Sequence, residues 1–156
     1  MGAEADGETV DYVAEILETI AEGIGVDATV AIDESGEGIT AEYIGEDLAL
    51  LVGRHGATID AIQHLAYRLA FHGVDRRRPL TVDAAGYRAR RAEVLRGLAD
   101  QAAESAVRER RPVRLEPMGA QERKVVHEYL KQRFDVETYS EGNEPSRRLV
   151  VAPAGG

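Results

Sequence analysis

The stretch Leu51-Val52-Gly53-Arg54-His55-Gly56-Ala57-Thr58-Ile59-Asp60-Ala61-Ile62-Gln63 decides the fold of this chain. It places a Gly-x-x-Gly loop between a short apolar segment, 48–52, and a segment with helical periodicity, 58–71. Glycines at both ends of the loop allow backbone to approach backbone. A helix that begins just past Gly56 directs free N–H groups and a positive dipole end at the loop, where Arg54 and His55 add charge and donors. The loop is therefore predicted to bind phosphate.

The segments around this loop follow the order α-β-β-α-α-β. The pattern predicts a helix over 9–22 that stops at Gly23, and an antiparallel hairpin with strands 26–32 and 39–43. A short helix over 46–52, the helix 58–71 and a strand over 80–84 complete the set. This order resembles the type II KH domain, whose Gly-x-x-Gly loop clamps about four nucleotides.

The KH resemblance implies a domain over residues 9–85 in which Gly53, Arg54, His55 and Gly56 contact RNA. Family members often carry Lys-Arg between the two glycines, and this chain has Arg54-His55. Because histidine is only partly charged near neutral pH, we expect weaker and pH-sensitive binding through the loop. The run of three arginines at 76–78 has two interpretations, a solvated turn or an added phosphate contact.

The second half predicts a long helix over 87–110 with an apolar stripe formed by Tyr87, Val94, Leu95, Leu98, Ala102 and Ala106. A strand over 113–115, a helix over 120–132 and a closing hairpin of 136–139 and 147–151 follow. Arg123 and His127 lie one turn apart on a single face of the second helix. Spacing alone leaves two interpretations open. The pair could grip phosphates, or Arg123 could pair with Glu116 or Glu122 while His127 is structural.

Residues 115–118, 122–127 and 140–148 resemble the small nucleic-acid-binding domain named after its Arg-x-x-x-His motif. A type II KH domain followed by this domain, here over 86–153, is similar to the bacterial Jag family, also called KhpB, of sporulation-associated RNA-binding proteins. The resemblance implies an α+β fold. It also implies that Arg123 and His127 contact the single strand and that Lys124, Arg147 and Arg148 lie on the same positive surface.

The Jag resemblance further implies single-stranded RNA as the ligand, with single-stranded DNA as a second candidate. It implies post-transcriptional control linked to cell division, elongation or sporulation, with cell shape and chaperone activity among the associated roles. A small KH-only protein is the implied partner in a hetero-oligomer. The alternative function is a protein-interaction adaptor that acts through a KH–KH dimer without binding RNA.

Composition argues against several other classes of protein. The 156 residues include no cysteine, and the four histidines lack ligand spacing, so we expect no disulfide, metal or cofactor. The chain has no P-loop and no activated nucleophile, so we expect no catalysis. An acidic N-terminus and the lack of an apolar run of roughly 20 residues predict a cytoplasmic protein without membrane insertion.

The net charge of −9 is unevenly distributed. Residues 1–47 contain 14 acidic residues and no Lys or Arg, whereas residues 48–156 contain 14 acidic and 19 basic residues. The distribution of charge matters more than its sum for nucleic-acid binding. The acidic third is either a solvated face, or a face that repels RNA or docks a basic partner.

Overall fold

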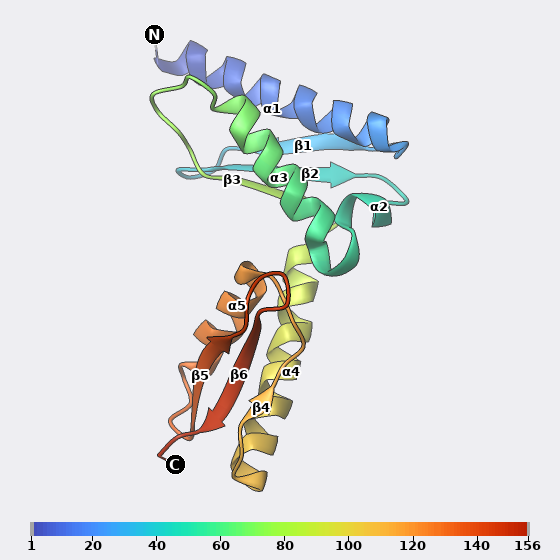
Figure 1. Cartoon of the computed structure of the whole chain (residues 1–156). Helices are drawn as coiled ribbons and strands as arrows, with labels where there is room; N and C mark the ends of the chain where they lie inside the picture. Colours follow the sequence, from blue (N-terminus) through green and yellow to red (C-terminus); the bar gives the residue numbers. More distant parts are fainter. Residues whose placement is uncertain (1, 156) are drawn as a thin grey trace. The chain divides into compact units, whose positions relative to one another are not determined.

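The computed structural model describes residues 2–155, which form two compact units divided between Arg88 and Ala89, inside helix α4. The elements, coloured along the chain in Figure 1, are α1 (Gly2–Ile24), β1 (Thr29–Asp33), β2 (Ile39–Ile44), α2 (Ala49–Val52), the 3-10 turn η1 (Arg54–Gly56), α3 (Ala57–Ala70), β3 (Leu80–Ala84), α4 (Tyr87–Glu109), β4 (Val113–Arg114), α5 (Ala120–Leu130), β5 (Val136–Glu141) and β6 (Arg148–Pro153). The predicted α+β class is confirmed.

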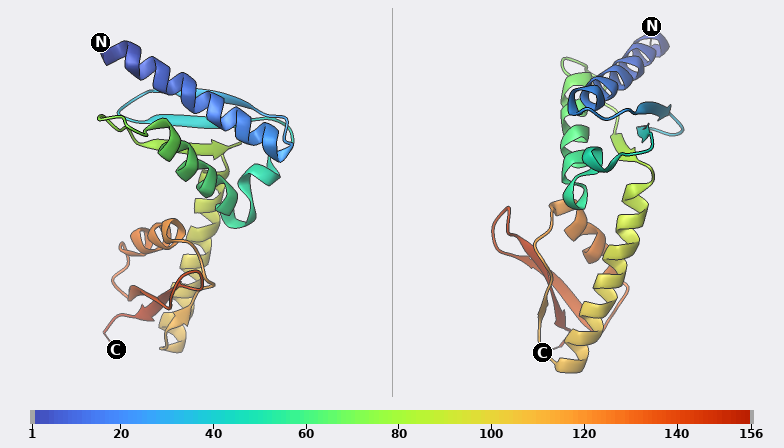
Figure 2. Two further views of the ribbon diagram at one scale, coloured as in Figure 1. Left: turned by 45° about the horizontal axis from the view of Figure 1, so that its top comes forward. Right: turned by 90° about the vertical axis from the view of Figure 1, so that its right-hand side faces the viewer.

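The first unit is a three-stranded sheet in the order β1-β2-β3. Strand β2 pairs antiparallel with β1, where Ala41 lies opposite Ile32, and parallel with β3, where Ala41 lies opposite Val82. Helices α1 and α3 lie side by side on one face of this sheet, as the views in Figures 1 and 2 agree. The predicted α-β-β-α-α-β order is confirmed.

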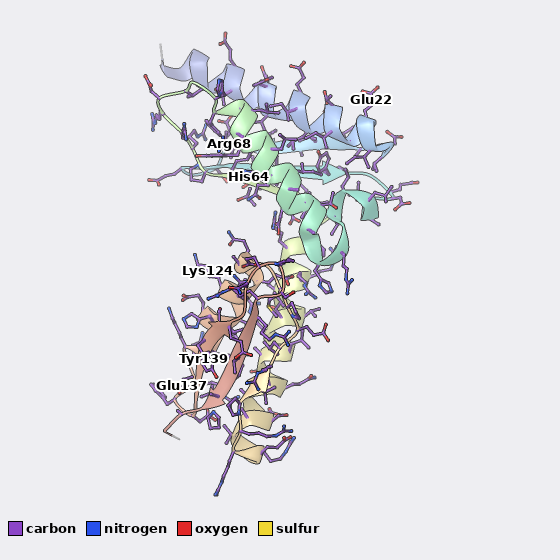
Figure 3. All side chains as sticks on the ribbon, in the orientation of Figure 1. Glu22, His64, Arg68, Lys124, Glu137 and Tyr139 are labelled. Carbon is purple, nitrogen blue, oxygen red and sulfur yellow. The ribbon has the colours of Figure 1, made fainter. Side chains whose placement is uncertain are left out.

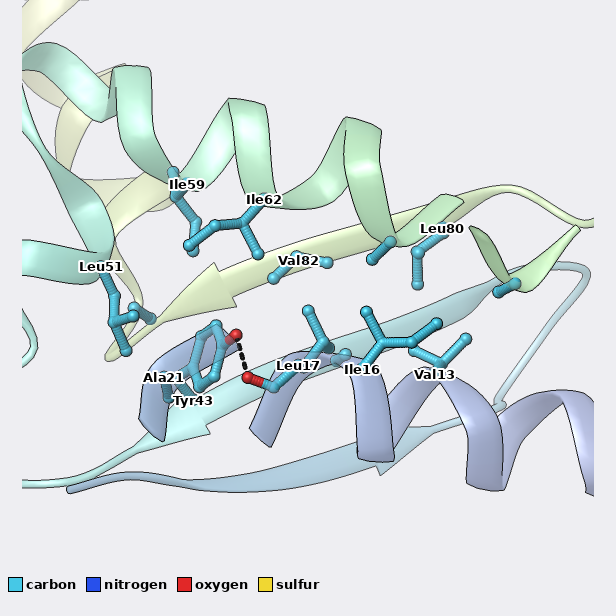
Figure 4. Packing of buried hydrophobic residues seen from close by; sticks show 14 of the residues in the cluster. Val13, Ile16, Leu17, Ala21, Tyr43, Leu51, Ile59, Ile62, Leu80 and Val82 are labelled. Carbon is cyan, nitrogen blue, oxygen red and sulfur yellow. Dashed lines mark hydrogen bonds between the residues drawn. The ribbon is translucent and has the colours of Figure 1, made fainter. Parts of the chain in front are cut away.

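The core of the first unit lies between the two helices and the sheet (Figure 4). Leu17 from α1, Ile59 from α3 and Val82 from β3 are fully buried there. Tyr43 is also buried, and its hydroxyl donates a 2.6 Å hydrogen bond to the carbonyl oxygen of Leu17. Burial, assisted by the charge of Glu18, raises the pKa of the Tyr43 hydroxyl. The phenol therefore stays neutral and ties β2 to α1.

The first helix is longer than predicted at both ends. It begins at Gly2 instead of Thr9, and it continues through Gly23 to Ile24. Gly25, with φ 86°, ends the helix instead. Its N–H donates to the carbonyl of Glu22 and the N–H of Val26 donates to the carbonyl of Ala21, which is the double bond pattern of a Schellman motif. The prediction that Gly23 stops the helix is therefore wrong. The Schellman motif needs a residue in the left-handed conformation, and Gly25, two positions later, supplies it.

The second unit is an antiparallel sheet in the order β4-β6-β5, packed on α4 and α5. Its core joins Leu95 of α4 and Val126 of α5 to Val151 of β6. The predicted stripe of α4 is partly wrong, since Val94 and Leu98 are exposed. Four small residues share the buried face of α4 with Leu95, namely Ala99, Ala102, Ala103 and Ala106. These residues belong to the same core cluster as Val126 and Val151.

Candidate nucleic-acid interface

The Gly-x-x-Gly loop is one tight turn between α2 and α3. Gly53 has φ 72° and ψ −179°, and Gly56 has φ 79° and ψ 12°. The first pair of angles belongs to a region that is essentially restricted to glycine, and the second to the left-handed region that glycine favours. His55 also adopts a positive φ, 53°, which is uncommon for a residue with a side chain.

Both loop glycines also make room for a neighbour. A Cβ atom on Gly53 would lie 2.1 Å from Oγ1 and 2.9 Å from the backbone N of Thr58. A Cβ atom on Gly56 would lie 2.8 Å from the ring of Tyr87. The first turn of α3 is therefore packed directly against the start of the loop, as the sequence predicts.

The two residues between the glycines are free to contact a ligand. Arg54 and His55 are exposed, and neither side chain makes an ion pair or hydrogen bond with another residue in 7–155. No side chain caps the start of α3, so its first N–H groups face the loop without a side-chain acceptor. The one carboxylate of this first turn, Asp60, accepts a 2.7 Å bond from Arg88. Positive charge, donors and a helix end therefore coincide at this loop.

The second unit has a groove of about 340 Å³ between α5 and the β5–β6 hairpin. Its lining includes four of the residues predicted to bind the single strand: Arg123, Lys124, His127 and Arg147. Figure 3 labels Lys124 on α5 and Tyr139 on β5, two of the elements that form the groove. Arg148 does not line the groove. It lies opposite Glu141 in the backbone register of β5 and β6, and it is half-buried.

The guanidinium of Arg123 is held by the protein itself. It donates 2.6 Å and 2.7 Å hydrogen bonds to the carbonyl of Met118 and to a carboxylate oxygen of Glu144, and its side chain is 10% exposed. Neither Glu116 nor Glu122 is the partner: Glu122 pairs with Arg91 at 2.6 Å. Arg123 therefore fastens the turn before α5 and the loop before β6 to the helix.

His127 is oriented by a strand residue that was not among the predicted site residues. Its Nδ1 shares a hydrogen bond with Oγ1 of Thr138 on β5. Nε2 has no hydrogen-bond partner among residues 7–155 and remains available for a ligand. Ser140, two positions along the strand from Thr138, also lines the groove. The sequence signal that could have indicated these two residues is their alternation: Thr138 and Ser140 follow the core residue Val136 at every second position of the strand.

Two further basic side chains surround the groove. Lys124 is exposed, and Arg147 donates a 2.8 Å hydrogen bond to the carbonyl of Gly142. A hydrogen bond from Lys131 lowers the pKa of Glu128, with smaller lowering from the charges of His127 and Lys124. Lys124 and Arg147 therefore place positive charge at the groove.

The three arginines before β3 divide into two kinds. Arg78 donates to a carboxylate oxygen of Glu34 at 2.7 Å and to the carbonyl of Gly38 at 3.2 Å, so it braces the hairpin turn. Arg76 and Arg77 are exposed. Within the described part of the chain, no group of three or more His, Cys, Asp or Glu side chains could hold a metal ion. No helix in residues 2–155 has the length and apolar character to cross a membrane.

Comparison with known proteins identifies both units. The KH domain model of KhpA/KhpB matches residues 10–80, and the model of the R-three-H domain, named after the Arg-x-x-x-His motif, matches residues 93–153. RNA-binding protein KhpB of Bacillus subtilis is 34% identical over 138 residues, covering 87% of this chain and 66% of that protein. The protein of the same name from Lactiplantibacillus plantarum is 34% identical over 150 residues, covering 96% and 47%. A third, from Clostridium symbiosum, is 32% identical over 144 residues, covering 91% and 65%.

The chain spans between about half and two thirds of the length of these relatives. Its two matched domains occur in the order that the sequence predicts, and each coincides with one compact unit of the structure. The chain belongs to the KhpB (Jag) family, with a KhpA/KhpB-type KH domain followed by an R-three-H domain.

Proposed function

We propose that this protein binds single-stranded RNA through two sites, the Gly53–Gly56 loop and the α5–β5 groove. The observation that carries this proposal is that Arg54 and His55 are exposed between two glycines just before α3, and that neither side chain has an ion-pair or hydrogen-bond partner among residues 7–155. The relatives, which are named RNA-binding proteins, support it. They favour RNA binding over an adaptor that acts without RNA.

Each site contributes a different kind of contact. The loop offers backbone N–H groups, the guanidinium of Arg54 and the imidazole of His55 to a phosphate. In the groove, Lys124, Nε2 of His127 and Arg147 act as the ligand-facing donors. Arg123 holds the groove in shape and adds positive charge, because its guanidinium is already bonded to Met118 and Glu144. Two weak sites in one chain reinforce each other, because an RNA bound at one site is held at a high effective concentration near the other.

Further assignments belong to the same proposal. The protein acts by binding and not by catalysis, in the cytoplasm, as a post-transcriptional regulator. Single-stranded DNA is a second ligand for the same contacts, since neither site as described depends on the 2′-hydroxyl. A small KH-only protein is the proposed hetero-oligomeric partner of the first unit.

The test is a fluorescence-anisotropy titration of the full chain with a labelled, mixed-sequence RNA of about 20 nucleotides. Binding that neutralises about four phosphates weakens roughly fiftyfold between about 50 and 200 mM salt. The variant Arg54→Asp/His55→Asp is expected to weaken binding at least about tenfold, because two carboxylates then face the phosphate.

The matched control is Arg68→Asp/His72→Asp, which makes the same changes in residue type and charge at exposed positions at the end of α3. It is expected to weaken binding about twofold, through net charge alone. Equal losses in the two double variants, with both proteins folded, would remove the loop from the binding site.

A further inference from the structure

The first unit has a second surface feature that RNA binding does not use. A groove of about 470 Å³ lies where the end of α1, the start of β1, the end of β2 and the start of α2 meet. We call it the acidic groove and define it by its lining, residues 25–29, 44–47 and Leu50. Two of its large apolar side chains are open to solvent, Ile44 at 55% and Leu50 at 64% exposure. The feature therefore combines a hollow with uncovered apolar surface.

The charge around the acidic groove has one sign. Asp27, Glu46 and Asp47 line it, and an adjoining hollow that shares residues 25–29 adds Glu18 and Glu22. Figure 3 labels Glu22 near the end of α1. All five are exposed, and none of them makes an ion pair or side-chain hydrogen bond within residues 7–155. Neither lining contains a lysine or arginine. These carboxylates therefore have no partner in that range that would neutralise them.

The backbone fixes the shape of the acidic groove. A Cβ atom on Gly45 would lie 2.7 Å from the carbonyl oxygen of Asp27 and 3.0 Å from Leu48. Only glycine lets the end of β2 approach the segment before β1 so closely. Ile44 pairs with Thr29 across the two strands, which sets the exposed apolar side chain beside Asp27 and Ala28. The groove is thus a built feature and not the result of flexible side chains.

We propose that the acidic groove docks a basic segment of a protein partner, with apolar side chains that cover Ile44 and Leu50 and lysines or arginines that pair with the carboxylates. Charge complementarity selects this occupant. An RNA strand would bring phosphates against five carboxylates, and a second copy of this chain in a two-fold contact would bring the same acidic face. The acidic groove shares no residue with either proposed RNA site, so failure of this proposal would leave the RNA proposal unaffected.

The test titrates the full chain with a labelled peptide of chemistry matched to the groove, two repeats of Lys-Leu-Lys-Lys-Leu-Lys. Two comparison peptides replace each leucine by serine or each lysine by glutamate. The variant Glu46→Lys/Asp47→Lys is expected to weaken binding of the Lys-Leu peptide about tenfold, since attraction becomes repulsion. The control Asp11→Lys/Glu15→Lys makes the same change in charge at exposed positions of α1 outside the groove. It is expected to change the affinity for the Lys-Leu peptide less than about twofold.

A second variant, Ile44→Thr, tests the apolar part of the site separately and keeps a β-branched residue in the strand. It is expected to weaken binding of the Lys-Leu peptide. Binding of the Lys-Ser peptide, which is weaker from the start, is expected to stay unchanged. Thermal unfolding checks that each variant is folded. Equal losses in the two charge-reversal variants, equal binding of the Lys-Leu and Lys-Ser peptides, or no binding of the Lys-Leu peptide would each overturn the proposal.

Discussion

At the scale of single residues, the Gly-x-x-Gly loop depends on Gly53 more than on any side chain. Its φ of 72° and ψ of −179° are nearly inaccessible to other residues, and Thr58 occupies the space of a Cβ atom. We expect Gly53→Ala to lower the free energy of unfolding by about 2 kcal/mol or more, from backbone strain and steric overlap. Urea unfolding followed by circular dichroism measures the change.

The control for this prediction is Gly23→Ala. Gly23 lies within α1, its φ is not positive, and a Cβ atom there would meet nothing within 4 Å. Replacement of a helical glycine by alanine is expected to raise stability by up to about 1 kcal/mol. A Gly53→Ala protein as stable as the wild type would contradict the described loop geometry.

The sequence was most informative for residues whose role depends only on their neighbours in the chain. The two loop glycines could be predicted because the turn and the residue that precedes the helix lie within four neighbouring residues. The partner of Arg123 could not, since Glu144 lies 21 positions away and only the tertiary fold brings them within 2.7 Å. The same holds for Thr138, which meets His127 across 11 positions.

At the scale of elements, α5 carries at adjacent positions a basic residue that is bonded within the protein and one that is proposed to contact the ligand. Arg123 is bonded to Met118 and Glu144, whereas the exposed Lys124 has no such partner within residues 7–155. We expect Arg123→Ala to lower the free energy of unfolding by about 2 kcal/mol, because a buried carbonyl loses its donor and the hairpin loop its anchor. Hydrogen exchange should accelerate at residues 142–147.

Lys124→Ala is the matched comparison. It should leave the free energy of unfolding within about 0.5 kcal/mol of the wild type. It should also weaken RNA binding and reduce the salt slope by about 0.7, the value for one lost phosphate contact on a single strand. Unchanged stability and exchange in Arg123→Ala would contradict the positioning role assigned to that side chain.

Element order was predictable because each segment carries its own periodicity and breakers. The strands of the first hairpin and the helix after the loop lie within a few residues of their expected bounds. The buried face of α4 was harder to predict. Helical spacing correctly places Leu95, Ala102 and Ala106 on the buried face, but it also selects Val94 and Leu98, which are exposed. Which side of such a helix packs is decided by the neighbouring elements.

At the scale of the whole molecule, acidic and basic residues concentrate in regions with different proposed roles. The acidic third contributes the acidic groove, and the positive side chains proposed to bind RNA all lie after residue 53. The net charge of −9 is therefore compatible with RNA binding, because phosphate responds to the local field of each site. The expected division at residues 85 and 86 lies close to the one observed between Arg88 and Ala89.

The central claim is that both units bind one RNA while the acidic groove does not. Its most direct test is a titration of the ¹⁵N-labelled full chain with a single-stranded RNA of about 20 nucleotides, followed by backbone amide chemical shifts. We expect perturbations at residues 53–58 and around the α5–β5 groove, at 120–127 and 138–147, with residues 25–29 and 44–47 unchanged. Perturbations confined to one unit, or strongest in the acidic groove, would contradict the claim.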